Sequence, residues 1–202
     1  MIKAVVFDFG NVICRFDNNL FLERISNFSD KSVERVRELI YEESDLPRRH
    51  ETGLMSGEDF YEEVVKLCGL KGISMEGFRA AFTDIFIPIK TTFELIRRLK
   101  PNYKLGLLSN TSQWDFEYGI KAIEVFDLFD SVSVSCEVGA MKPDERIFND
   151  ALGKLGQVAE ECVYIDDLEE FVEAARAMGF YGVQYVGYED LVRSLGELKI
   201  KF

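Results

Sequence analysis

Short apolar runs rich in β-forming residues alternate with longer amphipathic segments along most of this chain. Five such runs lie at residues 2–7, 104–108, 131–134, 162–165 and 182–186. Apolar runs of this length, without strict alternation, are typical of strands that are buried on both faces of a parallel sheet. The pattern therefore predicts five buried parallel strands.

The segments between these runs show helical periodicity. Their apolar residues fall on one helical face at residues 92–100, 143–155 and 168–178. Pro143 suits the first turn of the second helix, and Gly156 suits its C-terminal end. Strands that alternate with helices predict an α/β fold, with a Rossmann-like parallel sheet in a three-layer α/β/α core.

Residues 15–88 interrupt this alternation. They hold no convincing strand, and their amphipathic helical stretches lie at residues 20–25, 33–42, 57–68 and 75–86. An all-helical block after the first strand of an α/β domain predicts an inserted cap. We therefore expect residues 1–14 and 89–202 to form the α/β core and residues 15–88 to form a helical cap domain. The aromatic residues of this block are interpreted as cap core: Phe60, Tyr61, Phe78 and Phe82.

Composition narrows the class of protein. The chain has 202 residues, of which 47% are hydrophobic and 30% are charged, so it is able to bury a substantial core. No apolar run approaches the roughly 18 residues of a membrane span, and the N-terminus does not resemble a secretory signal. We therefore expect a cytoplasmic protein with no membrane partner. Its 4 cysteines form no CxxC pair and are interpreted as reduced packing residues.

Charge and histidine content exclude further functions. The net charge of −12 argues against nucleic-acid binding, because phosphate backbones favour clustered Lys and Arg. The single histidine, His50, lies in a polar stretch that predicts a surface turn, and we expect no catalytic role for it.

Polar residues follow the apolar runs where ligands bind in an open α/β sheet, beyond the carboxyl ends of the strands. In chain order they are Asp8, Ser109 with Asn110, Lys142, and Asp166 with Asp167. Each of them alone also fits a turn, a helix cap or a solvated charge. Together at one edge, the carboxylates would repel one another unless a cation lay among them, and oxygen ligands suit Mg²⁺. A nearby ammonium and hydroxyl complete a cradle in which a carboxylate attacks phosphorus.

The order and spacing of these residues resemble the haloacid dehalogenase superfamily over essentially the whole chain. The resemblance implies that Asp8 is the nucleophile that becomes phosphorylated, and that Gly10 binds the metal through its carbonyl. It implies that Ser109 holds the phosphoryl group and that Lys142 compensates its charge. Asp167 is then a direct Mg²⁺ ligand, and Asp166 coordinates directly or through water. Ser109, Asn110 and Lys142 form the expected substrate-binding set, and Asp8, Ser109 and Lys142 the expected catalytic set.

Gly10 departs from the usual pattern of the family. A second aspartate, which protonates the leaving oxygen and then activates water, normally stands at this position. The DFGNV sequence resembles a subgroup that includes bacterial sugar-1-phosphate phosphatases. Asp17 is the nearest downstream carboxylate, and we interpret it as a solvated loop residue.

The sequence therefore predicts a Mg²⁺-dependent phosphatase that hydrolyses a small phosphorylated metabolite, with a sugar 1-phosphate as one candidate. The alternative is a phosphometabolite-binding or regulatory protein with weak or no turnover, because Gly10 lacks the acid. A metal-free dehalogenase is disfavoured by the acidic pair, and a mutase by Gly10 itself. Candidate pocket-lining residues in the cap region are Arg15, Phe16, Arg48, Arg49 and Met55. The oligomeric state stays open.

Overall fold

Five parallel strands form the central sheet, in the order β5-β4-β1-β6-β7. The computed structural model describes all residues, 1–202. The strands are β1 (Ala4–Phe7), β4 (Lys104–Ser109), β5 (Ser131–Val134), β6 (Cys162–Asp166) and β7 (Tyr181–Gln184). In the centre, Val5 of β1 lies opposite Leu105 of β4 and Val163 of β6. All five predicted strands are present, and their ends differ from the prediction by at most two residues.

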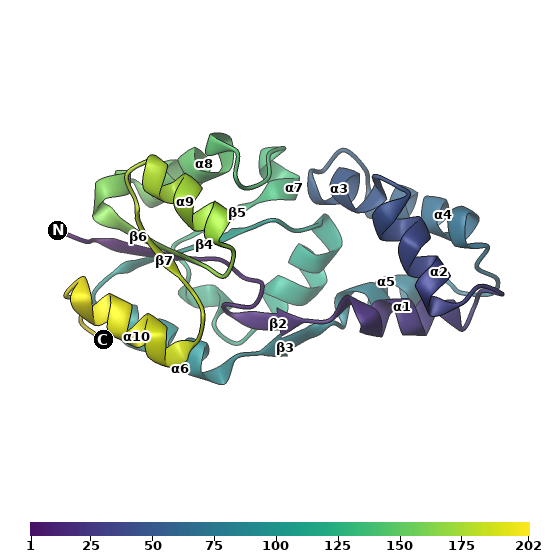
Figure 1. Cartoon of the computed structure of the whole chain (residues 1–202), viewed down its shortest axis with the longest axis horizontal. Helices are drawn as coiled ribbons and strands as arrows, with labels where there is room; N and C mark the ends of the chain where they lie inside the picture. Colours follow the sequence, from purple (N-terminus) through teal and green to yellow (C-terminus); the bar gives the residue numbers. More distant parts are fainter.

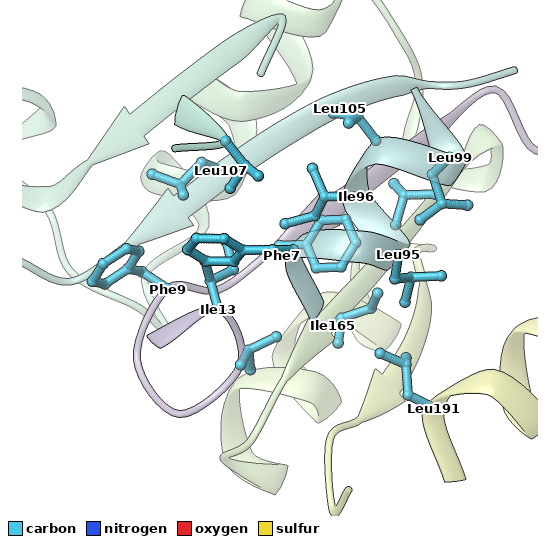
Figure 2. Close-up of a cluster of buried hydrophobic side chains, with 14 of the residues drawn as sticks. Phe7, Phe9, Ile13, Leu95, Ile96, Leu99, Leu105, Leu107, Ile165 and Leu191 are labelled. Atoms are coloured by element: carbon cyan, nitrogen blue, oxygen red, sulfur yellow. The ribbon is translucent and has the colours of Figure 1, made fainter. Parts of the chain in front are cut away.

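Helices cover both faces of this sheet (Figure 1). Val5 and Phe7 point to one face, where they share a core with helices α6 (Lys90–Leu99) and α10 (Tyr188–Glu197). Figure 2 shows Phe7 in this cluster, with Leu95 and Ile96 of α6 nearby. The alternate residues of β1 face helices α8 (Glu145–Leu155) and α9 (Glu169–Ala177) on the other side. The predicted three-layer α/β/α core is confirmed.

Two details of these helices differ from the prediction. Helix α10 has no counterpart among the predicted helices. Pro143 lies ahead of α8 rather than in its first turn, because the Asp144 carboxylate accepts a 2.9 Å hydrogen bond from the backbone N–H of Arg146 and caps the helix there.

The interrupting block is a separate helical layer, the predicted cap. Its helices are α1 (Asn18–Ser26), α2 (Val33–Arg37), α3 (Leu46–Glu51), α4 (Gly57–Cys68) and α5 (Met75–Thr83). A π-helical turn, Glu38–Glu42, continues α2. Their apolar faces share one hydrophobic cluster, in which Phe60 and Phe78 are buried and Tyr61 and Phe82 are partly buried. No helix of the protein reaches the length and apolarity that crossing a membrane requires.

The expectation that residues 15–88 contain no strand is wrong. Strand β2 (Cys14–Phe16) pairs antiparallel with β3 (Phe86–Pro88), and this ribbon joins the sheet domain to the helical layer (Figure 1). Each strand has only three residues, too few for a readable alternation, and each finds its partner far along the chain. Both predicted cap boundaries fall in this ribbon, and we propose that it is the joint between the core and the cap.

The expectation that His50 lies in a surface turn is also wrong. Its side chain is 1% exposed, and its ring stacks on Phe60 with centroids 4.6 Å apart. Helix α3 forms where the sequence looked irregular, and it places Leu46 and His50 one turn apart on its buried side. Neither ring nitrogen has a hydrogen-bond partner, and burial lowers the pKa of His50 to about 4.

This burial predicts a pH-dependent loss of stability. The unfolded chain binds a proton at His50 below pH ~6.5, whereas the folded protein does so only near pH 4. The free energy of unfolding should therefore fall as the pH drops from ~6.5 toward 4, by up to about 1.4 kcal/mol per pH unit. Urea unfolding at several pH values, compared with His50→Leu, measures this contribution. If both proteins lose stability in parallel, His50 does not titrate in this way.

Candidate active site

The acidic and hydroxyl residues of the expected site come together because β1, β4 and β6 are neighbours in the sheet. Asp8 follows β1, Ser109 ends β4, and Asp166 ends β6 with Asp167 directly after it. Carboxyl ends of parallel strands lie at one edge, so these side chains converge there. Lys142 arrives differently. The short helix α7 (Ser135–Val138) and a loop separate it from the end of β5.

Lys142 is the electrostatic centre of the site. Its side chain is buried, and its Nζ lies 2.6 Å from Asp8 Oδ1 and 2.7 Å from Asp166 Oδ2. The same ammonium lies 4.9 Å from the centroid of the Phe171 ring. A buried ammonium between two carboxylates is a charge-assisted arrangement that holds all three side chains in place.

Burial and neighbouring charges shift the ionisation of this group. Burial raises the pKa of Asp8 to about 7, with Asp166 adding to the rise and the Lys142 charge opposing it. Burial by itself would lower the pKa of Lys142, but the two carboxylates outweigh it and raise that pKa above its ordinary value. Lys142 is therefore cationic at neutral pH. Full ionisation of Asp8 calls for further positive charge nearby.

The two adjacent aspartates have different surroundings. Asp166 is fully engaged, because its Oδ1 accepts from the backbone N–H of Leu168 at 2.9 Å while its Oδ2 accepts from Lys142 and the Tyr164 hydroxyl. Asp167 is half-buried and accepts a single side-chain hydrogen bond, at 3.0 Å, from Asn11 Nδ2. This difference favours Asp167 for direct contact with a cation and Asp166 for holding Lys142.

The carboxylates fit a divalent metal ion. Asp8, Asp166 and Asp167 each offer an oxygen, and the three oxygens lie within 4.8 Å of one another. Three carboxylates around one ammonium carry an excess of negative charge, and hard oxygen donors suit Mg²⁺. The expected fourth donor, the carbonyl of Gly10, belongs to the loop that begins directly after Asp8.

Asn110 and Ser109 lie next to the carboxylates and Lys142, and their side chains make different contacts. The Asn110 side chain binds the backbone of Lys142, accepting from its N–H at 2.8 Å and donating to its carbonyl at 3.2 Å. This contact favours a positioning role for Asn110 over direct contact with substrate. The buried Ser109 hydroxyl makes only a 3.4 Å contact to the Asn110 carbonyl, so it is free to donate to a ligand.

Sequence reasoning missed Tyr164, Asn11 and Phe171. Tyr164 could have been found, because it lies two positions before Asp166 on β6 and side chains of a strand share a face with period two. Asn11 adopts a left-handed backbone conformation (φ 54°) that turns its amide toward Asp167. No sequence feature marks Phe171 as a site residue, because its position on α9 is that of an ordinary core residue.

The residues expected to line a pocket divide into three groups. Arg48 and Arg49 of the cap line a cleft of about 920 Å³ together with Lys142 and its loop. Met55 instead lies in the hydrophobic cluster of the cap. Arg15 and Phe16 are exposed on β2, and the Phe16 ring lies over Gly10.

Direct contacts hold the cap against the core beside this site. Trp114, from the helical turn that follows β4, belongs to the hydrophobic cluster of the cap, and a Cβ added at Gly57 would lie 2.0 Å from its ring. The Ser135 hydroxyl donates to the backbone carbonyl of Glu51 at 2.6 Å. The segment that follows Ser109 is thus packed directly against the cap.

The chain is similar to known proteins along most of its length. Residues 2–179 match the family model described as haloacid dehalogenase-like hydrolase. The chain belongs to this family. Membership of the haloacid dehalogenase-like hydrolases confirms the resemblance inferred from the motifs, and with it the expectation that the chain is an enzyme.

Three similar proteins illustrate the range of the family. D-ribitol-5-phosphate phosphatase of Bacteroides thetaiotaomicron is 26% identical over 197 residues, covering 89% of this chain and 90% of its own. Glyceraldehyde 3-phosphate phosphatase of Methanothermobacter thermautotrophicus is 28% identical, covering 82% and 76%. A solved HAD family enzyme from Bacteroides thetaiotaomicron, in complex with magnesium and inorganic phosphate, has a TM-score of 0.78 at 22% identity, covering 91% and 94%. This last likeness confirms the fold.

Proposed function

We propose that this hydrolase is a Mg²⁺-dependent phosphatase of a small phosphorylated metabolite, with Asp8 as the nucleophile. The observation that carries the proposal is the buried Lys142 ammonium, held between Asp8 and Asp166 beside a third carboxylate. A phosphate dianion approaching a carboxylate nucleophile needs this concentration of positive charge.

The residues have separable roles in this proposal. An Asp8 oxygen attacks phosphorus, so a bond forms between Asp8 and the phosphoryl group while the ester bond breaks and its electron pair leaves with the alcohol oxygen. Water then hydrolyses the acyl phosphate and releases Asp8 and inorganic phosphate. The Ser109 hydroxyl and Lys142 bind the phosphoryl oxygens. Asp8, Asp167 and the Gly10 carbonyl would hold Mg²⁺, with Asp166 binding it directly or through water, and the ion would supply additional positive charge.

The similar proteins support a small phosphorylated substrate. Two of them are named as phosphatases, of ribitol 5-phosphate and of glyceraldehyde 3-phosphate, and the solved enzyme is complexed with magnesium and inorganic phosphate. Both named substrates are alkyl phosphates, whereas Gly10 favours a better leaving group in this chain. The more specific proposal, that the substrate is a sugar 1-phosphate, therefore rests on Gly10 and not on the similar proteins.

A phosphometabolite-binding role without turnover is the second candidate, and the absence of a side-chain acid at Gly10 is the observation that favours it. The two candidates are separated by incubating the purified protein with a chromogenic phosphate ester, with and without Mg²⁺. Mg²⁺-dependent release of phosphate supports the enzyme. Binding of orthophosphate without any turnover supports the second role.

The metal assignment predicts unequal effects of two neighbouring substitutions. Asp167→Asn should raise the Mg²⁺ concentration required for half-maximal activity sharply, because a charged carboxylate ligand is replaced by a neutral amide whose oxygen binds Mg²⁺ more weakly. Asp166→Asn should change that requirement less and lower the maximal rate instead, because it loosens the contact with Lys142. Activity is titrated with Mg²⁺ after EDTA treatment. Full activity of EDTA-treated wild type without added metal contradicts the assignment.

The leaving group should matter strongly to this protein. A positioned general acid typically contributes about 10²–10⁴-fold, and its absence at Gly10 penalises basic leaving oxygens most. Anomeric, aryl and acyl phosphates should therefore react faster than alkyl phosphates, with a steep dependence on leaving-group pKa in single-turnover kinetics. A flat dependence would show that another group supplies the proton. Asp17 is poorly placed for this, because its Oδ1 caps α1 through the Asn19 N–H at 2.9 Å.

A further inference from the structure

The space next to Gly10 is filled by an aromatic ring. A Cβ added at Gly10 would lie 3.0 Å from Cε1 and 3.4 Å from Cδ1 of Phe16, and 3.8 Å from Asp8 Oδ2. Contacts near 3.0 Å are tighter than ordinary carbon–carbon packing, so any side chain at position 10 requires the ring to move. The Phe16 ring therefore stands beside the nucleophile, at the place where a side chain of residue 10 would begin.

This ring is held by the joint between the core and the cap. Phe16 ends β2 and pairs with Phe86 of β3, whose ring packs edge-on against Phe9 with centroids 5.1 Å apart. Phe16 itself is 42% exposed and takes no part in any of the three hydrophobic clusters. A large aromatic side chain that is positioned by a strand pair, yet left open to solvent beside a catalytic carboxylate, is available to contact a ligand.

We propose that Phe16 is a specificity-determining residue, and that its ring forms the wall against which the leaving group of the substrate lies. The leaving group then has a flat apolar face, as an aryl group or a pyranose ring does. This inference rests on the proposed phosphatase function and deepens it. Because Gly10 supplies no proton, the leaving oxygen has to be weakly basic. An aryl or anomeric leaving group has such an oxygen and also a ring that can stack on Phe16.

The inference is testable without turnover, by using phosphonates that cannot be hydrolysed. Binding of phenylphosphonate and methylphosphonate is measured by calorimetry in the presence of Mg²⁺. The wild type should bind phenylphosphonate about three- to tenfold more tightly, the range expected for one aromatic contact. Phe16→Ala should abolish this preference while it leaves methylphosphonate affinity within about twofold.

Ile87→Ala is the matched control. Ile87 lies on the same ribbon, opposite Arg15, and is 54% exposed, but it follows Phe86 and so points to the other face of the ribbon. Ile87→Ala should keep the phenylphosphonate preference. A preference that is absent from the wild type, survives Phe16→Ala or disappears in Ile87→Ala overturns the inference.

Orthophosphate binding is measured in parallel. If wild type with Mg²⁺ does not bind orthophosphate, the proposed phosphate site is wrong and the inference falls with it.

A second pair of variants tests the steric part. Gly10→Asp alone should weaken orthophosphate binding, because the new side chain and the Phe16 ring compete for one space. Gly10→Asp combined with Phe16→Ala should restore that binding, so the two substitutions are strongly non-additive. Additive effects contradict the shared space. The double variant could recover orthophosphate binding while Phe16→Ala still prefers phenylphosphonate as the wild type does. Phe16 and a side chain at position 10 would then share one space, but the ring would not be the wall for the leaving group.

Discussion

Asp8→Asn should lower phosphatase turnover by about 10³-fold or more while the protein keeps its fold. The substitution preserves the shape of the side chain and removes the attacking anion, so no bond to phosphorus can form. The amide still accepts a hydrogen bond from Lys142, which lies 2.6 Å from Asp8 Oδ1. Turnover of a chromogenic ester and the circular dichroism spectrum measure the two halves of this prediction. In wild type, beryllium fluoride should be trapped on Asp8 and on no other residue.

Asp17→Asn provides the matched control for Asp8→Asn. It removes the same charge from a nearby carboxylate, and asparagine caps a helix as well as aspartate does, so α1 should be undisturbed. Turnover should stay within about twofold of the wild type. Near-normal activity of Asp8→Asn would remove Asp8 from the mechanism. A large loss in Asp17→Asn would instead identify a second functional carboxylate.

Removal of the Lys142 ammonium should have the second large effect, on stability and activity together. Lys142→Met leaves Asp8 and Asp166 buried against each other without their cation. Breaking a buried ion pair by removing one partner typically costs about 3–5 kcal/mol. Urea unfolding measures the loss, and turnover should fall as well. Added Mg²⁺ should recover part of the stability. Lys142→Arg should not restore activity, because a planar guanidinium does not reproduce a compact ammonium between two carboxylates.

A surface lysine gives the comparison for Lys142. Lys154 pairs with Asp150 at 2.8 Å, but both side chains are about a third exposed. Lys154→Met should therefore cost no more than about 1 kcal/mol and leave turnover unchanged. Equal, small effects of the two substitutions would contradict the structural and catalytic role assigned to Lys142.

The sequence alone determined the layout of the core and the order of the motifs. Buried parallel strands require uninterrupted apolar runs, and the run before Asp8 became β1, which is buried along its whole length. Because ligand sites follow the carboxyl ends of such strands, locating the strands also located Asp8, Ser109 and Asp166. This inference uses only the local pattern of apolar residues, which one amino-acid sequence is enough to show.

Only the tertiary structure decided which side chains touch. Lys142 and Asp8 are 134 residues apart, and no local pattern indicates that one ammonium bridges Asp8 and Asp166. His50 reads as polar surface because its helix is short, yet the cap encloses it. The sequence indicates Phe16 only as one of five candidate pocket-lining residues, whereas in the fold a short strand pair places its ring over Gly10. Local periodicity records which side of an element is buried, whereas these contacts depend on partners that only the folded chain brings together.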